Sequence, residues 1–182
     1  MCGIAGYVGD RESADVLVDA LSKLEYRGYD SAGIAVFDHG NIKVKKCKGR
    51  LANLVEKMDE EGKPQGHVGI GHTRWATHGE PSDINSHPHQ ASKGDITVVH
   101  NGIIENYAEL TKFLKDKGYE FKSATDTEVI PNLVDYYYKD GRNLFDAVVK
   151  ATSKLEGSFA IGVIANNEPD KIIAVRKDSP LI

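Results

Sequence analysis

Met1-Cys2-Gly3-Ile4-Ala5-Gly6 opens the chain, and every later motif is interpreted in relation to it. If Met1 is removed, Cys2 carries a thiol and a free α-amine on the same residue. The reference pKa values of these groups are about 8.5 and about 7.7–8.0, so both are close to their reactive forms near neutral pH. The stretch therefore predicts a nucleophile with its own base. The alternative is an ordinary first strand with a buried cysteine.

The length and composition are those of one ordinary globular domain, or of most of a larger one. The chain has 182 residues, of which 40% are hydrophobic and 27% are charged. Its net charge of −4 argues against nucleic acid or an anionic membrane as the main partner. No apolar run is long enough to span a membrane, and no basic-then-apolar leader precedes Cys2. Two cysteines, Cys2 and Cys47, are typical of a reducing cytoplasm, and a disulfide between them would silence the nucleophile.

Hydrophobic periodicity predicts alternating strands and helices. Ser13 is expected to cap a helix whose apolar positions reach Leu24 and which ends at Arg27-Gly28. The pattern from Ile96 predicts a strand that stops at Asn101-Gly102. The other expected elements are strands at 31–37, 42–48, 68–72, 158–164 and 171–175, and helices at 51–58, 107–114, 129–137 and 144–151. Strands followed by paired helices predict an α+β fold with two sheets stacked between helix layers.

A basic run covers residues 43–50. Ile42 and Val44 alternate with Lys43 and Lys45, so the lysines are expected on the solvated face of a strand. A nucleic-acid patch is the alternative interpretation. No aromatic residues are interleaved with the lysines, as a patch that stacks bases would require, and we therefore expect no nucleic-acid partner.

Four histidines, His72, His78, His87 and His89, lie in or beside the long polar segment 73–95. A loop of that length inside a compact domain is usually functional. Metal binding is one interpretation of the histidines, but their spacing of six and two residues is not a zinc pattern. We therefore expect hydrogen-bonding loop histidines, with no metal and no cofactor.

Three groups of polar residues can bind a small charged ligand. Arg74 can clamp a carboxylate in bidentate geometry and Trp75 can close over a ligand, the alternatives being an ion pair and a core anchor. The Asn101 amide and the Gly102 N–H can donate to an oxyanion, although Asn-Gly also forms ordinary turns. Asp126 can bind an ammonium group or stabilise the start of a helix.

Five motifs together resemble a single family. They are Cys2-Gly3-Ile4, Arg27-Gly28-Tyr29-Asp30-Ser31-Ala32-Gly33, His72-Thr73-Arg74-Trp75-Ala76-Thr77-His78-Gly79, His100-Asn101-Gly102 and Thr125-Asp126-Thr127-Glu128. In this order they resemble the class II glutamine amidotransferases, and within them the branch whose members aminate fructose 6-phosphate. Other branches share the terminal cysteine and the Asn-Gly but not the second and third motifs. The resemblance extends from Cys2 to Ile182.

The resemblance implies an α+β, Ntn-hydrolase fold, a four-layer αββα sandwich of two antiparallel sheets. It also implies that Cys2 attacks the side-chain amide of glutamine to form a thioester, with its α-amine moving the proton. Asn101 and the Gly102 N–H would hold the oxyanion. Arg74 would bind the α-carboxylate of glutamine, and Asp126 its α-ammonium.

Supporting roles follow from the same resemblance. Thr77 and His78 would line the glutamine pocket, and Trp75 would belong to the loop that covers it. Arg27 would support the nucleophile from behind the pocket. Neither a metal nor a cofactor is implied.

The resemblance also predicts what a longer protein would contain. Residues 1–182 are expected to be a glutaminase domain truncated at its C-terminal end, without the sugar-phosphate isomerase domain. Glutamine is the expected substrate, and fructose 6-phosphate would be reached only through the absent domain. The full-length enzyme would be a cytoplasmic homo-oligomer. The alternative is a glutamine-binding or interaction fragment that is catalytically inactive because of truncation or retained Met1.

Overall fold

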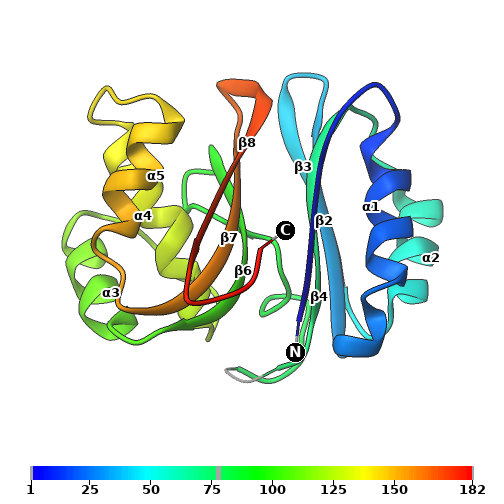
Figure 1. Cartoon of the computed structure of the whole chain (residues 1–182), viewed down its shortest axis with the longest axis horizontal. Helices are drawn as coiled ribbons and strands as arrows, with labels where there is room; N and C mark the ends of the chain where they lie inside the picture. Colours follow the sequence, from blue (N-terminus) through cyan, green and yellow to red (C-terminus); the bar gives the residue numbers. More distant parts are fainter. Residues whose placement is uncertain (1, 77–78, 182) are drawn as a thin grey trace.

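Two antiparallel sheets of four strands each lie face to face in the computed structural model, which describes residues 2–76 and 79–181 (Figure 1). The first sheet has the strand order β1-β4-β2-β3, and the second has the order β5-β6-β7-β8. The strands are β1 (Gly3–Val8), β2 (Ser31–Asp38), β3 (Asn41–Lys48), β4 (Val68–Arg74), β5 (His89–Gln90), β6 (Ile96–Ile104), β7 (Gly157–Ala165) and β8 (Glu168–Lys177).

Helices cover the outer face of each sheet (Figure 1). The first sheet is covered by α1 (Ser13–Ser22) and α2 (Leu51–Glu61), and the second by α3 (Tyr107–Asp116), α4 (Val129–Tyr138) and α5 (Leu144–Thr152). Two 3₁₀ turns, η1 (Glu25–Arg27) and η2 (Asp126–Glu128), precede β2 and α4. The predicted α+β sandwich of four αββα layers is therefore confirmed. Within the described residues, no helix is long and apolar enough to cross a membrane.

Three apolar cores hold the layers together. The core between the sheets consists of Ala35, Ile42, Val68, Ile70, Val99 and Ile164. Leu17 and Leu21 of α1 pack on the outer face of the first sheet, and Ile130 and Leu133 of α4 pack on that of the second. Because both faces of the first sheet are covered, β2 is buried continuously over residues 31–36 and lacks the period of two that marks a half-exposed strand.

The first helix is shorter than predicted. Glu12 occupies the position before the helix, so the prediction that Ser13 caps it is wrong: Ser13 is already its first residue. Leu24 N–H donates to Leu21 O (3.0 Å), an i→i−3 bond that tightens the chain just after the helix ends at Ser22. Leu24 therefore lies outside the helix, and the predicted end at Arg27-Gly28 is wrong because η1 intervenes.

The sixth strand continues past its predicted end. Asn101 and Gly102 pair with Ala160 and Phe159 of β7, so the prediction that the strand stops at Asn101-Gly102 is wrong. Gly102 has a φ of +131°, and a Cβ at this position would lie 2.0 Å from Ser158 O. Glycine permits both the backbone conformation and the close approach of β7, so the pairing continues where a turn was expected.

One lysine of the basic run 43–50 turns inward, against the prediction of a solvated face. Lys46 Nζ donates to Ser86 O (2.7 Å) and to Pro88 O (3.1 Å). Burial lowers the pKa of Lys46 to about 8. The carbonyl oxygens replace the water that the ammonium group loses, and the lysine in turn fixes the segment that leads into β5.

Candidate active site

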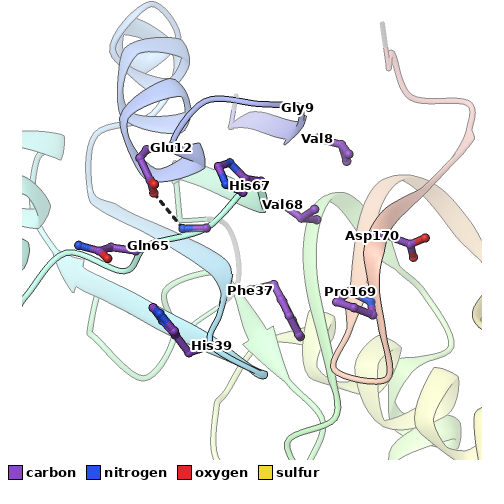
Figure 2. Close-up of a pocket in the computed structure, with 11 residues that line it drawn as sticks. Val8, Gly9, Glu12, Phe37, His39, Gln65, His67, Val68, Pro169 and Asp170 are labelled. Carbon is purple, nitrogen blue, oxygen red and sulfur yellow. Dashed lines mark hydrogen bonds between the residues drawn. The ribbon is translucent and has the colours of Figure 1, made fainter.

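Two cavities lie at opposite ends of the sandwich. The smaller, of ≈ 40 Å³, lies where β1 begins and β4 ends. The larger, of ≈ 610 Å³, is a cleft beside Val8, the β2–β3 turn and the start of β8 (Figure 2). The smaller cavity is lined by five of the residues predicted to act in catalysis and glutamine binding: Cys2, Arg74, Asn101, Gly102 and Asp126.

Strand pairing brings these five residues together from distant parts of the chain. The start of β1 pairs with the end of β4, which places Cys2 close to Arg74. The second sheet contributes Asn101 and Gly102 from β6, and Asp126 comes from η2 directly before α4. The site is therefore built where both sheets end, and it depends on their correct packing.

Cys2 lies against the backbone of Trp75. Trp75 N–H donates to Cys2 Sγ (3.2 Å), and the thiol can donate to Trp75 O (3.5 Å). Burial raises the pKa of the Cys2 thiol above its ordinary value, whereas the Trp75 N–H and the positive charge of Arg74 act in the opposite direction. Because burial is the largest of these effects, the thiol needs a base to become the reactive thiolate.

Two N–H donors lie beside the cysteine. Asn101 Nδ2 donates to Cys2 O (3.1 Å). Along β6, the N–H groups of His100 and Ile104 point away from β7, because they donate to a histidine nitrogen (3.3 Å) and a carboxylate oxygen (2.8 Å) of the cavity wall. Backbone N–H groups alternate in direction along an antiparallel strand, so Gly102 N–H points to the same side.

The cavity also holds two buried side chains of opposite charge. Arg74 is 4% exposed, and its Nη2 donates to Gly79 O (2.9 Å). Asp126 is 7% exposed, and its Oδ2 accepts from Ile104 N–H (2.8 Å). Burying a charge is unfavourable unless another group compensates it. The pair suits a ligand that carries both a carboxylate and an ammonium group.

Four buried histidines form a cluster at the cavity: His87 and His100 line it, and His72 and His89 lie behind them. The rings of His72 and His87 stack at 4.0 Å, and those of His87 and His89 meet edge to face at 4.8 Å. Burial lowers the pKa of all four, to about 4 for His72 and about 3 for His100. The prediction of loop histidines is wrong for His89, which lies in β5, whereas His72 lies in β4, in the strand predicted at 68–72. Among the described residues, no group of three or more His, Cys, Asp and Glu is arranged to hold a metal ion.

The remaining predicted residues have different positions. Trp75 is 46% exposed, and its ring meets that of Tyr29 edge to face at 5.3 Å. Arg27 lies on η1, which packs against β4, but it does not line the cavity. Its support of the nucleophile stays a prediction. Thr77 and His78, which were predicted to line the pocket, lie outside the described residues.

Asp30 organises the segment after β4, which the sequence did not predict. Its N–H donates to Arg74 O (3.1 Å), and its carboxylate accepts from Ala76 N–H. The signal was present in the motif at residues 27–33, but the motif does not say which of its side chains reaches the site. Other residues that line the cavity and were not predicted are His87, His100, Thr125 and Thr127.

A cysteine beside two N–H donors and a buried pair of charges defines the class of this site. The chain belongs to the glutamine amidotransferase domain family, which residues 72–180 match. It is 65% identical to the glutamine–fructose-6-phosphate aminotransferase (isomerizing) of Clostridium acetobutylicum and 68% identical to that of Clostridium perfringens. Both matches cover 100% of this chain but 29% of the relative, so the chain spans less than a third of the length of these proteins.

The fold has a solved counterpart in another amidotransferase. Glutamine phosphoribosylpyrophosphate amidotransferase from B. subtilis superposes with a TM-score of 0.76 and 26% sequence identity. The match covers 91% of this chain and 35% of that chain. The Ntn-type fold that the sequence implied is therefore confirmed.

Proposed function

We propose that this chain hydrolyses glutamine to glutamate and ammonia, with Cys2 as the nucleophile after removal of Met1. The observation that carries the proposal is the convergence of three features on one cavity. These are the Cys2 thiol, the N–H donors of Asn101 and Gly102, and the buried charges of Arg74 and Asp126. A nucleophile, an oxyanion site and a clamp for both ends of an amino acid are what this hydrolysis requires.

Each group has a role in the proposed reaction. Arg74 and Asp126 bind the α-carboxylate and α-ammonium groups of glutamine and direct its side-chain amide toward Cys2. The α-amine takes the proton of the Cys2 thiol, Sγ attacks the amide carbon, and the charge that develops on oxygen is stabilised by Asn101 Nδ2–H and Gly102 N–H. The C–N bond then breaks, and the protonated α-amine of Cys2 donates a proton to the departing ammonia. Water, deprotonated by the same amine, cleaves the thioester to give glutamate.

The α-amine is the base that the environment of Cys2 requires. Burial keeps the thiol protonated at neutral pH, because it raises the pKa of the thiol above its ordinary value. An α-amine has a reference pKa of about 7.7–8.0, close to the value that suits a general base at neutral pH. In a peptide bond with Met1 this nitrogen is not basic, so the proposal requires processing of the chain.

Binding of glutamine requires one wall of the cavity to move. The volume of ≈ 40 Å³ is far below the roughly 300–1,000 Å³ of ordinary small-molecule sites. Glutamine is several times larger than this cavity. Trp75 does not line the cavity, but it is half-exposed and contacts Cys2 through its backbone, and we propose that it moves aside for glutamine and closes over it.

The proposal extends to the longer protein. The names of the two clostridial relatives couple glutamine to fructose 6-phosphate. We infer that residues 1–182 form the glutaminase domain of such an enzyme and that ammonia reaches fructose 6-phosphate at a site outside this chain. Fructose 6-phosphate should then leave glutamate production by this chain unchanged. Stimulation of glutamate production, or formation of glucosamine 6-phosphate, would contradict this.

The test is glutamate release by the chain without Met1, with processing verified by intact mass. Cys2→Ala should abolish release while leaving the fold intact, and Cys2→Ser should retain little, because a hydroxyl ionises far less readily than a thiol. Cys47→Ala is the control, because Cys47 is a free thiol buried in the core between the first sheet and its helices. A processed chain that binds glutamine but releases no glutamate would instead be an inactive binding fragment.

A further inference from the structure

His72 joins the two sheets directly behind the proposed oxyanion site. The residue is buried on β4, and its Nε2 lies 2.9 Å from Asn101 Oδ1 and 3.1 Å from His100 O, both on β6. A backbone carbonyl oxygen only accepts hydrogen bonds, so the contact with His100 O requires a hydrogen on His72 Nε2. Asn101 Oδ1 therefore accepts a hydrogen bond from His72 Nε2–H.

The orientation of the Asn101 amide follows from the contacts at its two ends. The amide atom opposite His72 lies 3.1 Å from Cys2 O, which also only accepts. One orientation satisfies both contacts: Oδ1 accepts from His72, and Nδ2 donates to Cys2 O. A flipped amide would place two oxygens together at Cys2 and two N–H groups together at His72, at the expense of both hydrogen bonds.

The surroundings of His72 keep its own ring and proton fixed. The ring stacks on His87 at 4.0 Å with an interplanar angle of 13°. Burial lowers the pKa of His72 to about 4, so the ring is neutral and carries one N–H at physiological pH. Its Nδ1 has no hydrogen-bond partner among the described residues, which agrees with a hydrogen on Nε2.

We propose that His72 is a positioning residue for glutamine hydrolysis, whose Nε2–H holds Asn101 Oδ1 and so keeps Asn101 Nδ2–H directed at the oxyanion. The inference rests on the proposed function. Among the described residues, Nδ2 makes one hydrogen bond, to Cys2 O, so its second N–H is available for the substrate. His72 acts through Asn101 and does not itself line the cavity.

Two substitutions of His72 distinguish the effect of its Nε2–H donor from the effect of its stacked ring. His72→Phe keeps a planar ring to stack on His87 but has no N–H, whereas His72→Gln places an amide N–H near the position of Nε2. In the processed chain, His72→Phe should lower kcat for glutamine hydrolysis about 100-fold, as the loss of an oxyanion donor does, with less than about a threefold change in KM. His72→Gln should restore kcat to within about tenfold of the unaltered chain.

His89→Phe is the matched control. His89 is also buried and contacts His87, but it does not contact Asn101. This variant should lose stability as His72→Phe does and yet keep its kcat. The proposal is overturned if His72→Phe has a kcat within about threefold of that of His89→Phe, or if His72→Gln is no more active than His72→Phe.

A measurement on the unaltered chain covers the case in which a variant does not fold. Nitrogen-15 NMR at pH 7 should show His72 with a protonated Nε2 and a bare Nδ1, and the opposite tautomer would overturn the proposal. Activity that survives Cys2→Ala would refute the proposed function. An inactive Cys2→Ala beside a fully active His72→Phe would refute only the role of His72.

Discussion

The cavities at the two ends of the sandwich differ in size and in the burial of their polar residues, and the smaller cavity has the more buried ones. The cleft at the far end measures ≈ 610 Å³, and the cavity at Cys2 measures ≈ 40 Å³. The polar residues of the cleft are exposed, and the side chains of two of them, Glu12 and His67, bind the local backbone (Figure 2). Glu12 Oε2 accepts from Gly66 N–H (2.9 Å), and His67 Nδ1 donates to Arg11 O (3.1 Å).

At the small cavity, by contrast, the charged side chains are buried. Arg74 and Asp126 are almost completely buried, and both line the cavity beside Cys2. Burying charges around a small space is unfavourable unless a ligand or a protein group compensates them. What marks the functional end is therefore the enclosure of convergent polar groups, and the volume of the cleft is not a guide to function.

The largest expected effect compares a glycine from each end. Gly102 at the site and Gly40 in the β2–β3 turn both have positive φ, +131° and +93°. A Cβ at Gly102 would lie 2.0 Å from Ser158 O, whereas a Cβ at Gly40 meets no atom within 4 Å. We expect Gly40→Ala to lower the free energy of unfolding by about 1 kcal/mol and Gly102→Ala by at least about 4 kcal/mol. Equal losses in urea unfolding would show that the close pairing of β6 and β7 is not required.

The second expected effect concerns the cluster of buried histidines at the site. Burial lowers the folded-state pKa of His72, His87, His89 and His100, so the unfolded chain binds more protons once the pH falls below about 6.5. Their contribution to stability is complete above that pH and is lost progressively as the pH falls toward each folded-state pKa, which is about 4 for His72 and about 3 for His100. Each should lower the free energy of unfolding by about 0.8 kcal/mol at pH 6.0, or about 3 kcal/mol together.

Urea midpoints measured between pH 7.5 and 6.0 test this, because carboxylates titrate mainly below that range. His87→Gln removes one of the four titrating groups and should make the pH dependence shallower. A midpoint that does not change over this range would mean that the histidines are not held neutral in the folded protein.

The third and smallest effect compares charged side chains at the two ends. Arg74→Lys loses bidentate geometry, and Asp126→Asn loses the charge proposed to bind the α-ammonium group. Each should weaken glutamine binding by roughly 1.5–3 kcal/mol, the range for a charge-assisted hydrogen bond. Asp170→Asn makes the same change at the exposed cleft and should leave the KM for glutamine unchanged. Glutamine titrations with the same KM for both site variants and the control would place the substrate elsewhere.

Local patterns predicted most of the fold. The apolar stripe that contains Leu17 and Leu21 identified α1, and both residues are buried in the core of the first sheet. The end of β6 was predicted wrongly for a physical reason. Asn101-Gly102 has turn chemistry in isolation, and only pairing with β7 makes it part of a strand. Such pairing is a tertiary feature that no local window contains.

The residues of the site likewise divide into those that local patterns predicted and those that they did not. Polar residues that follow buried strands identified Arg74 and Asn101, whereas the grouping of Cys2 with Asp126 needed the resemblance to a family. The position of His72 behind Asn101 depends on how β4 faces β6 across the two sheets. The contact of Asp30 with the segment after β4 likewise depends on packing between distant residues. Neither could be read from spacing.

The central claim is that Cys2 is the nucleophile of a glutamine-binding cavity, and covalent labelling tests it most directly. The probe is a glutamine analogue that carries a chloromethyl ketone in place of the carboxamide, applied to the processed chain and followed by peptide mass spectrometry. We expect one adduct, on Cys2, which excess glutamine prevents, with Cys47 unlabelled in its buried core. Labelling of Cys47, or labelling of Cys2 that glutamine does not compete, would contradict the claim.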